Sequence, residues 1–167
     1  MNKQLFIPKK CVTLLVAPPG AGKSTFASKH FLWSSVISSD HCRALVCDYA
    51  MSQNATDSAF KVVECILHQR LFHQVSSVID ATNLNPDRRL AYKNTAQLYG
   101  FVTGVLLLDS SLAQCLRQNK QRTNVVPDDV IHKHYGLWEK ACHDVFSEGY
   151  EFIEVVQPHQ QYDIIDV

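Results

Sequence analysis

The chain has 167 residues, 46% of them apolar, and its 16 lysines and arginines are balanced by 16 aspartates and glutamates. A chain of this length is expected to form one domain, residues 1–167, that buries its core without help from metals or disulfides. Zero net charge argues against a protein that coats long nucleic acids, and no apolar run approaches the roughly 18 residues of a membrane span.

The first predicted element is an apolar strand at residues 12–16, followed by a glycine-rich loop and a helix at 23–31. The loop reads APPGAGKST over residues 17–25, and this succession of strand, loop and helix predicts a phosphate-binding P-loop. Glycines let backbone N–H groups curl around a phosphate, and the helix start adds free N–H groups and a positive dipole end. We therefore predict nucleotide binding by Gly20, Ala21, Gly22, Lys23, Ser24 and Thr25.

Two residues of this loop have specific predicted roles. Lys23 would reach the β- and γ-phosphates of ATP, and the Ser24 hydroxyl would ligate Mg²⁺. Ala17 stands where the P-loop pattern usually begins with glycine. Because alanine fits a strand end with negative φ, we expect the loop to keep its conformation.

A second strand is predicted at residues 35–37, with Asp40 and Arg43 shortly after it. A carboxylate at this strand end can accept a proton from an acceptor hydroxyl, so Asp40 is the candidate general base. Arg43 follows one turn later if the segment is helical, and its planar guanidinium suits a phosphate on the acceptor. A helix-capping aspartate and a solvated surface arginine are the alternatives.

An irregular connection at 47–54 and a long helix at 55–73 lead to a third strand at 77–80. This strand ends in Asp80, which resembles a Walker B carboxylate that holds Mg²⁺ through water. Thr82 and Asn83 come next. Two roles are equally compatible with them: hydrogen bonding to the substrate or the γ-phosphate, and shaping the turn before the next helix.

The remaining elements continue the alternation. Asn85 and Pro86 predict the start of a helix at 86–99 and Gly100 its end; strand 101–108, helices 111–121 and 127–146, and strand 152–156 follow. Alternating strands and helices indicate an α/β fold. We predict a P-loop kinase-like three-layer sandwich, with a five-stranded, mostly parallel sheet, helices on both faces and a helical lid at about residues 111–135.

The predicted lid is basic, with Arg117 and Arg122 in the segment RQNKQRT at 117–123. In small phosphotransferases such a segment closes over the nucleotide and excludes water, and its arginines neutralise charge on the transferring phosphoryl group. Arg122 is the first candidate for this role and Arg117 the second. A solvated helix face is the alternative for both.

Together these motifs resemble the polynucleotide 5′-kinase domain of bacterial Pnkp, an RNA end-healing and end-sealing protein. The resemblance runs from about residue 7 to 157 and rests on GKSTFA, VISSD with CR, VIDATN, NK with RT, and VI with KH, in that order. It implies that Asp40 is the general base, that Arg43 contacts an acceptor phosphate, that Gln53 lies on the acceptor side and that Val130 packs near the terminal base. It also suggests a homodimer.

One departure from this family affects the lid. The family carries two lid arginines four residues apart; Arg122 matches the second, whereas the first falls on Gln118 and Arg117 is displaced by one place. One residue turns a helical side chain by about 100°. The family protein also continues into phosphatase and ligase domains, whose activities we do not expect here.

The sequence therefore predicts a kinase that uses ATP and Mg²⁺ to phosphorylate the 5′-hydroxyl end of RNA or DNA. Six scattered cysteines without a C-x-x-C pair indicate reduced thiols and a cytoplasmic protein. Two alternatives stay open. One is a kinase for a hydroxyl of a sugar, nucleoside or antibiotic; the other is a catalytically degraded ATP-binding interaction module, to which Gln118 points.

Overall fold

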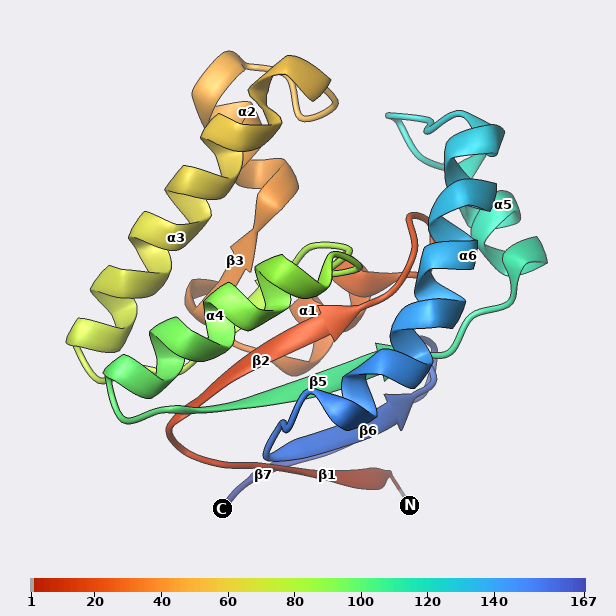
Figure 1. Ribbon diagram of the computed structural model, residues 1–167. Helices are drawn as coiled ribbons and strands as arrows, with labels where there is room; N and C mark the ends of the chain where they lie inside the picture. The colour runs from red at the N-terminus through yellow and green to blue at the C-terminus, as the bar shows by residue number, and fades with distance from the viewer. Residues whose placement is uncertain (1) are drawn as a thin grey trace.

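The computed structural model describes residues 2–167, and a sheet of five parallel strands in the order β3-β4-β2-β5-β6 runs through its centre (Figure 1). In that order the strands are β3 (Val36–Ser38), β4 (Ser77–Asp80), β2 (Cys11–Val16), β5 (Val102–Leu108) and β6 (Phe152–Val156). The predicted α/β fold and five-stranded sheet are confirmed, and every pairing in this sheet is parallel.

Helices cover both faces of the sheet (Figure 1). They are α1 (Lys23–His30), α2 (Ser39–Cys47), α3 (Thr56–Phe72), α4 (Pro86–Leu98), α5 (Leu112–Asn119) and α6 (Asp128–Asp144), with short 3-10 turns at Trp33–Ser35, Gln53–Ala55 and Val145–Ser147. α4 packs over β2 and β5, while α1 lies behind the sheet against β3 and β4. Within residues 2–167, no helix is both long and apolar enough to cross a lipid bilayer.

The middle strands explain why the sheet could be predicted. β2 is buried along its whole length, and β5 is buried from Thr103 to Leu108. Parallel strands that are covered on both faces have continuously apolar sequences, and both runs show this pattern. The carboxyl ends of β2, β3 and β4 meet at one edge of the sheet, where ligand sites form in open α/β folds.

A separate two-stranded parallel sheet pairs β1 (Lys3–Ile7) with β7 (Tyr162–Asp166). Neither strand was predicted, because each has few buried residues and is ordered by pairing between distant parts of the sequence. Tyr162 joins this pair to α1. Its ring packs edge-on against Phe26, and its backbone N–H donates to His30 Nε2 at 3.1 Å. The pair therefore supports the helix that follows the P-loop.

The segment after β3 is the helix α2, so Arg43 does lie one helical turn after Asp40. The Ser38 side chain accepts a hydrogen bond from the His41 N–H and starts α2, so Ser38, not Asp40, is the capping residue. Residues 48–55 then connect α2 to α3 without regular structure except for the 3-10 turn at Gln53–Ala55. This agrees with the irregular connection predicted at 47–54.

The turn between β4 and α4 is fixed by a cap and by a buried charge pair. The Asn85 side chain accepts from the N–H groups of Asp87 and Arg88, as the predicted helix start requires. The fully buried Arg89 donates to the Asn83 carbonyl at 2.9 Å and to both carboxylate oxygens of Glu148. A buried cation is tolerated when it is paired and hydrogen-bonded, so this pair fixes the turn.

Glu148→Ala should leave Arg89 buried without its anionic partner and lower the free energy of unfolding by ~3–5 kcal/mol, measured by denaturant titration. Lys140→Ala is the matched control, because it removes an exposed pair with Asp144 at 2.6 Å and should hardly move the unfolding midpoint. Equal losses in the two variants would contradict the structural role of the buried pair.

Candidate active site

The loop between β2 and α1 has the conformation of a phosphate cradle. Gly20 and Gly22 have φ values of +81° and +90°, which glycine adopts without strain. A Cβ on Gly20 would lie 2.4 Å from the carbonyl oxygen of Cys115, so the loop packs directly on α5. No side chain within residues 2–167 caps α1, and its first N–H groups are therefore free for an anionic ligand.

Ala17 fits the position that glycine usually occupies. It is fully buried and has a negative φ, and its N–H donates to the Thr82 carbonyl at 3.2 Å. The expectation that the loop keeps its conformation is therefore confirmed. The same hydrogen bond joins the start of the P-loop to the turn that follows β4.

Lys23 is the first residue of α1 and folds back over the loop. Its Nζ donates to the carbonyl oxygens of Ala17 at 3.1 Å and Pro18 at 2.8 Å. Burial lowers the pKa of Lys23 to about 8, and the nearby carboxylates of Asp80 and Asp40 oppose this shift only in part. The cation is thus desolvated without full anionic compensation, which the phosphates of a nucleotide can supply.

Asp80 ends β4, where it pairs in register with Leu15 of β2. Burial raises the pKa of this carboxyl, whereas Lys23 and the Ser24 hydroxyl lower it. Mg²⁺ in phosphotransferases is commonly held by a carboxylate or two together with substrate phosphates. The Ser24 hydroxyl and the Asp80 carboxylate fit that donor set.

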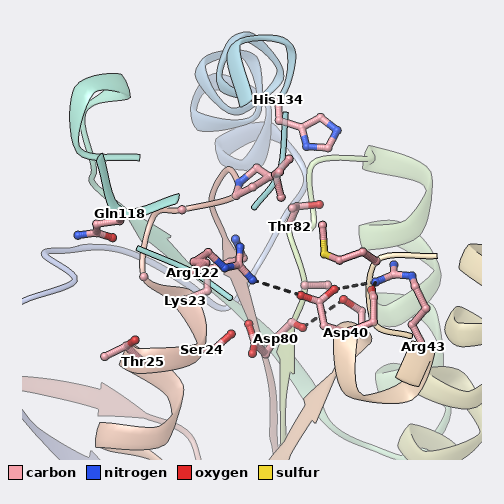
Figure 2. Close-up of a pocket in the computed structure, with 18 of the residues that line it drawn as sticks. Lys23, Ser24, Thr25, Asp40, Arg43, Asp80, Thr82, Gln118, Arg122 and His134 are labelled. Carbon is pink, nitrogen blue, oxygen red and sulfur yellow. Dashed lines mark hydrogen bonds and ion pairs between the residues drawn. The ribbon is translucent and has the colours of Figure 1, made fainter. Parts of the chain in front are cut away.

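Asp40 lies between two arginines (Figure 2). Arg43 Nη1 donates to Asp40 Oδ1 at 2.7 Å and to the Ala50 carbonyl at 2.8 Å, and Arg122 Nη2 is 3.8 Å from Asp40 Oδ2. The Asp40 side chain is 48% exposed, while the Arg43 side chain is only 11% exposed. A half-exposed carboxylate thus faces the cavity, paired with one arginine from its own helix and one from the segment between α5 and α6.

A cavity of about 670 Å³ brings these groups together. Most of the predicted site residues line it: Gly20, Gly22, Lys23, Ser24, Thr25, Asp40, Arg43, Gln53, Asp80, Thr82, Arg122 and Val130. Ala21, Asn83 and Arg117 are outside this lining. Ala21 is buried behind the loop, where its carbonyl accepts a hydrogen bond from Ser110 Oγ at 3.2 Å.

Asn83 shapes the turn and does not reach the cavity. It is buried with φ of +51°, and its amide nitrogen donates to the carbonyls of Leu15 at 2.8 Å and Ile79 at 3.1 Å. Two roles were considered for Asn83 from the sequence, ligand binding and shaping the turn. Its hydrogen bonds are those of a residue that shapes the turn. Thr82 lines the cavity, as the ligand-binding role requires.

Arg117 does not recover the place of the first lid arginine. Cys115 and Asn119 form the buried side of α5, so Arg117 projects into solvent. Gln118 lines the cavity instead, and its amide donates to His159 Nε2 at 3.0 Å. Of the two predicted lid arginines, the structure brings only Arg122 to the site.

Several lining residues were missed by the sequence analysis. They are Pro19, Ser39, Ala50, Met51, Thr56, Phe60, Ala81, Gln121, Val126, His134, Pro158 and His159. Those of residues 50–60 come from the connection before α3 and the start of that helix, for which the sequence carries no motif. Val130 and His134 are four apart, and this helical spacing on the predicted helix 127–146 was a usable signal for His134.

A family model described as an AAA domain matches residues 12–139, which include the P-loop, Asp40, Asp80 and Arg122. The chain belongs to this AAA domain family. The matched residues contain the P-loop, a phosphate-binding element of nucleotide-binding proteins. The family match thus agrees with the cradle at the start of α1.

Solved structures share the fold at low identity. A chain of the Pnkp1/Rnl/Hen1 RNA repair complex matches with a TM-score of 0.68 and 21% identity over 83% of this chain, which spans 47% of that chain. A structure from the PezAT toxin–antitoxin system of Streptococcus pneumoniae matches with a TM-score of 0.62 and 18% identity, and the match covers 96% of this chain and 71% of that chain. A gluconokinase from Sinorhizobium meliloti matches with a TM-score of 0.56 and 16% identity, and the match covers 94% of this chain and 86% of that chain.

The pKa of Lys23 predicts how ATP binding depends on pH. Above pH of about 8 the free protein loses the Lys23 charge, and bound phosphates should restore it. ATP affinity should therefore fall as the pH rises above about 8, and binding there should take up a proton. Calorimetry at about pH 8.5 in two buffers of different ionisation enthalpy measures this uptake.

Lys23→Arg is the control, because an arginine does not titrate in this range and should bind ATP without proton uptake. Wild-type affinity that stayed constant from about pH 7 to 9.5 would contradict the proposed contact between Lys23 and the phosphates.

Proposed function

We propose that the protein is a polynucleotide 5′-hydroxyl kinase, which transfers the γ-phosphate of ATP to the 5′ end of RNA or DNA. The observation that carries the proposal is the place of Asp40, between Arg122 of the lid and Arg43 of α2, in the wall of the cavity that also contains Lys23. This arrangement suits an acceptor that carries both a hydroxyl and a phosphate. A polynucleotide 5′ end is such an acceptor, since its first phosphodiester lies one sugar away from the 5′-hydroxyl.

In this reaction the P-loop N–H groups and Lys23 bind the β- and γ-phosphates. Ser24 and Asp80 would hold Mg²⁺, which neutralises part of the phosphate charge when bound. The oxygen of the 5′-hydroxyl bonds to the γ-phosphorus, and Asp40 accepts the hydroxyl proton. The bond between the γ-phosphorus and the β–γ bridging oxygen breaks, which releases ADP. Arg122 stabilises the charge that develops on the transferring group.

Acceptor binding frees the general base. In the protein without ligand, Arg43 donates to the Asp40 carboxylate at 2.7 Å, and an acceptor phosphate competes for the same guanidinium. Gln53 lies on the same side of the cavity, and Phe60 and Val130 add apolar surface on which a nucleobase can lie. The resemblance to the kinase domain of Pnkp supports this assignment of the acceptor side.

The lid is proposed to span about residues 111–135 of a single kinase domain, residues 1–167, that acts on nucleic-acid ends. Gln118 replaces one lid arginine, and Arg122 alone brings a lid guanidinium to Asp40. Arg122 Nη2 is 3.8 Å from that carboxylate, and we assign the charge stabilisation to this one arginine.

Incubation with labelled ATP, Mg²⁺ and short 5′-hydroxyl RNA and DNA oligonucleotides tests the function directly, beside a panel of sugars, nucleosides and antibiotics. Label should appear at the oligonucleotide 5′ end, and Asp40→Asn should lower the rate by ~10²–10⁴ while ATP affinity stays near that of the wild type. Label only on a small molecule would overturn the polynucleotide acceptor. ATP binding without transfer, restored by Gln118→Arg, would indicate a degraded lid.

The two arginines of the lid should differ sharply. Arg122→Ala should lower the turnover number by ~10³ or more, because it removes the arginine that we assign to the transferring phosphoryl group. Arg117→Ala is the matched control on the solvent side of α5 and should leave turnover within about twofold. Initial rates at saturating ATP measure both, and a large loss in Arg117→Ala would mean that α5 rotates when the lid closes.

A further inference from the structure

Unpaired polar atoms collect on one side of the active-site cavity. Within residues 2–167, the buried side-chain nitrogen and oxygen atoms without a hydrogen-bond partner belong to Arg43, Thr56, Asn83, Tyr92, Thr103, His134 and Trp138. Three of these residues, Arg43, Thr56 and His134, line the cavity. Most buried polar groups in folded proteins are paired, and an unpaired one lowers the stability of the fold. A ligand that hydrogen-bonds these groups would recover that stability.

The unpaired atoms come from both walls of the cavity. Arg43 and Thr56 come from α2 and from the start of α3, whereas His134 comes from α6 across the cavity. In Figure 2, His134 lies on the side of Thr82 and apart from Gln118 and Thr25. It is also near enough to Lys23 for that cation to lower its pKa. The donor lysine, by contrast, has protein partners for its ammonium group.

The atoms differ in what they can bind. Arg43 Nε is a cationic donor and suits the acceptor phosphate already assigned to this guanidinium. Thr56 Oγ1 can donate or accept a hydrogen bond. Burial lowers the pKa of His134, and Lys23 and Lys133 act in the same direction, so its imidazole is neutral at pH 7 and also has one donor and one acceptor. Thr56 and His134 therefore suit a neutral polar group.

We propose that Thr56 and His134 hydrogen-bond the terminal nucleoside of the acceptor and make the enzyme specific for it. The apolar side chains of Met51, Phe60 and Val130 line the same cavity and provide surface for a flat base. This inference rests on the proposed function. The nucleoside group that both residues read is a hydroxyl of the sugar or a polar edge of the base.

The test compares acceptor and ATP kinetics in Thr56→Val and His134→Leu. Each variant should raise the KM for the 5′-hydroxyl oligonucleotide about three- to tenfold, the value of one hydrogen bond, with the KM for ATP unchanged. Thr56→Val should also keep or raise the melting temperature, because it removes a hydroxyl without a partner. His134→Asn, whose amide lies where Nδ1 does, should restore the acceptor KM.

Thr95→Val on α4 and the exposed His132→Leu on α6 are the matched controls, and neither residue lines the cavity. Acceptors with a terminal ribonucleoside, a 2′-deoxynucleoside or an abasic sugar show which group is read. Variant effects that vanish on the deoxy acceptor assign the 2′-hydroxyl, and effects that vanish on the abasic acceptor assign the base; either result supports the inference.

Equal variant effects on all three acceptors, equal changes in the KM for ATP, or a melting temperature that falls in Thr56→Val would overturn the inference. The two levels of proposal can also be separated. Wild-type protein that labels no oligonucleotide overturns the proposed function and this inference together. Wild-type protein that labels oligonucleotides, with both variants unchanged, overturns the inference alone.

Discussion

The side-chain amide of Asn83 joins the ends of the two strands that supply the nucleotide site. It donates to carbonyls near the ends of β2 and β4, and Ala17 in turn donates to the neighbouring Thr82 carbonyl. Arg89 holds the Asn83 carbonyl from the interior. The P-loop and the strand that ends in Asp80 are therefore parts of one hydrogen-bonded unit. Their relative position is fixed before any ligand binds, which is the preorganisation that phosphoryl transfer requires.

The cavity beside this unit has more positive than negative side chains, which favours an anionic ligand. Lys23, Arg43 and Arg122 outnumber Asp40 and Asp80, and burial shifts the pKa values of Lys23 and Asp80 toward their neutral forms. The buried Lys23 and the nearly buried Arg43 gain most from a phosphate chain that replaces their lost hydration. Both ion pairs of Asp40 involve an arginine, whose guanidinium can also form two hydrogen bonds to a phosphate.

Sequence patterns were sufficient where chemistry and local structure coincide. The P-loop needs glycine at fixed places, and fully buried strands such as β5 are continuously apolar, so both could be predicted. The direction of Arg117 could not be predicted, because it depends on which side of α5 packs against the core, and Cys115 and Asn119 form that side. β1 and β7 depend on pairing across the whole chain, and Met51, Phe60 and Thr56 reach the cavity through a connection that has no motif.

The β1–β7 pair has a mechanical consequence. The two strands run parallel, with Lys3 beside Tyr162 and Ile7 beside Asp166, so the two ends of the chain leave the ribbon at opposite ends (Figure 1). A force that pulls the termini apart therefore loads the ribbon in shear, and its hydrogen bonds resist together instead of opening one after another. The β1–β7 pair is hydrogen-bonded to α1 through Tyr162 and His30. Tension sufficient to slide the two strands past each other would therefore also loosen the phosphate cradle at the start of α1.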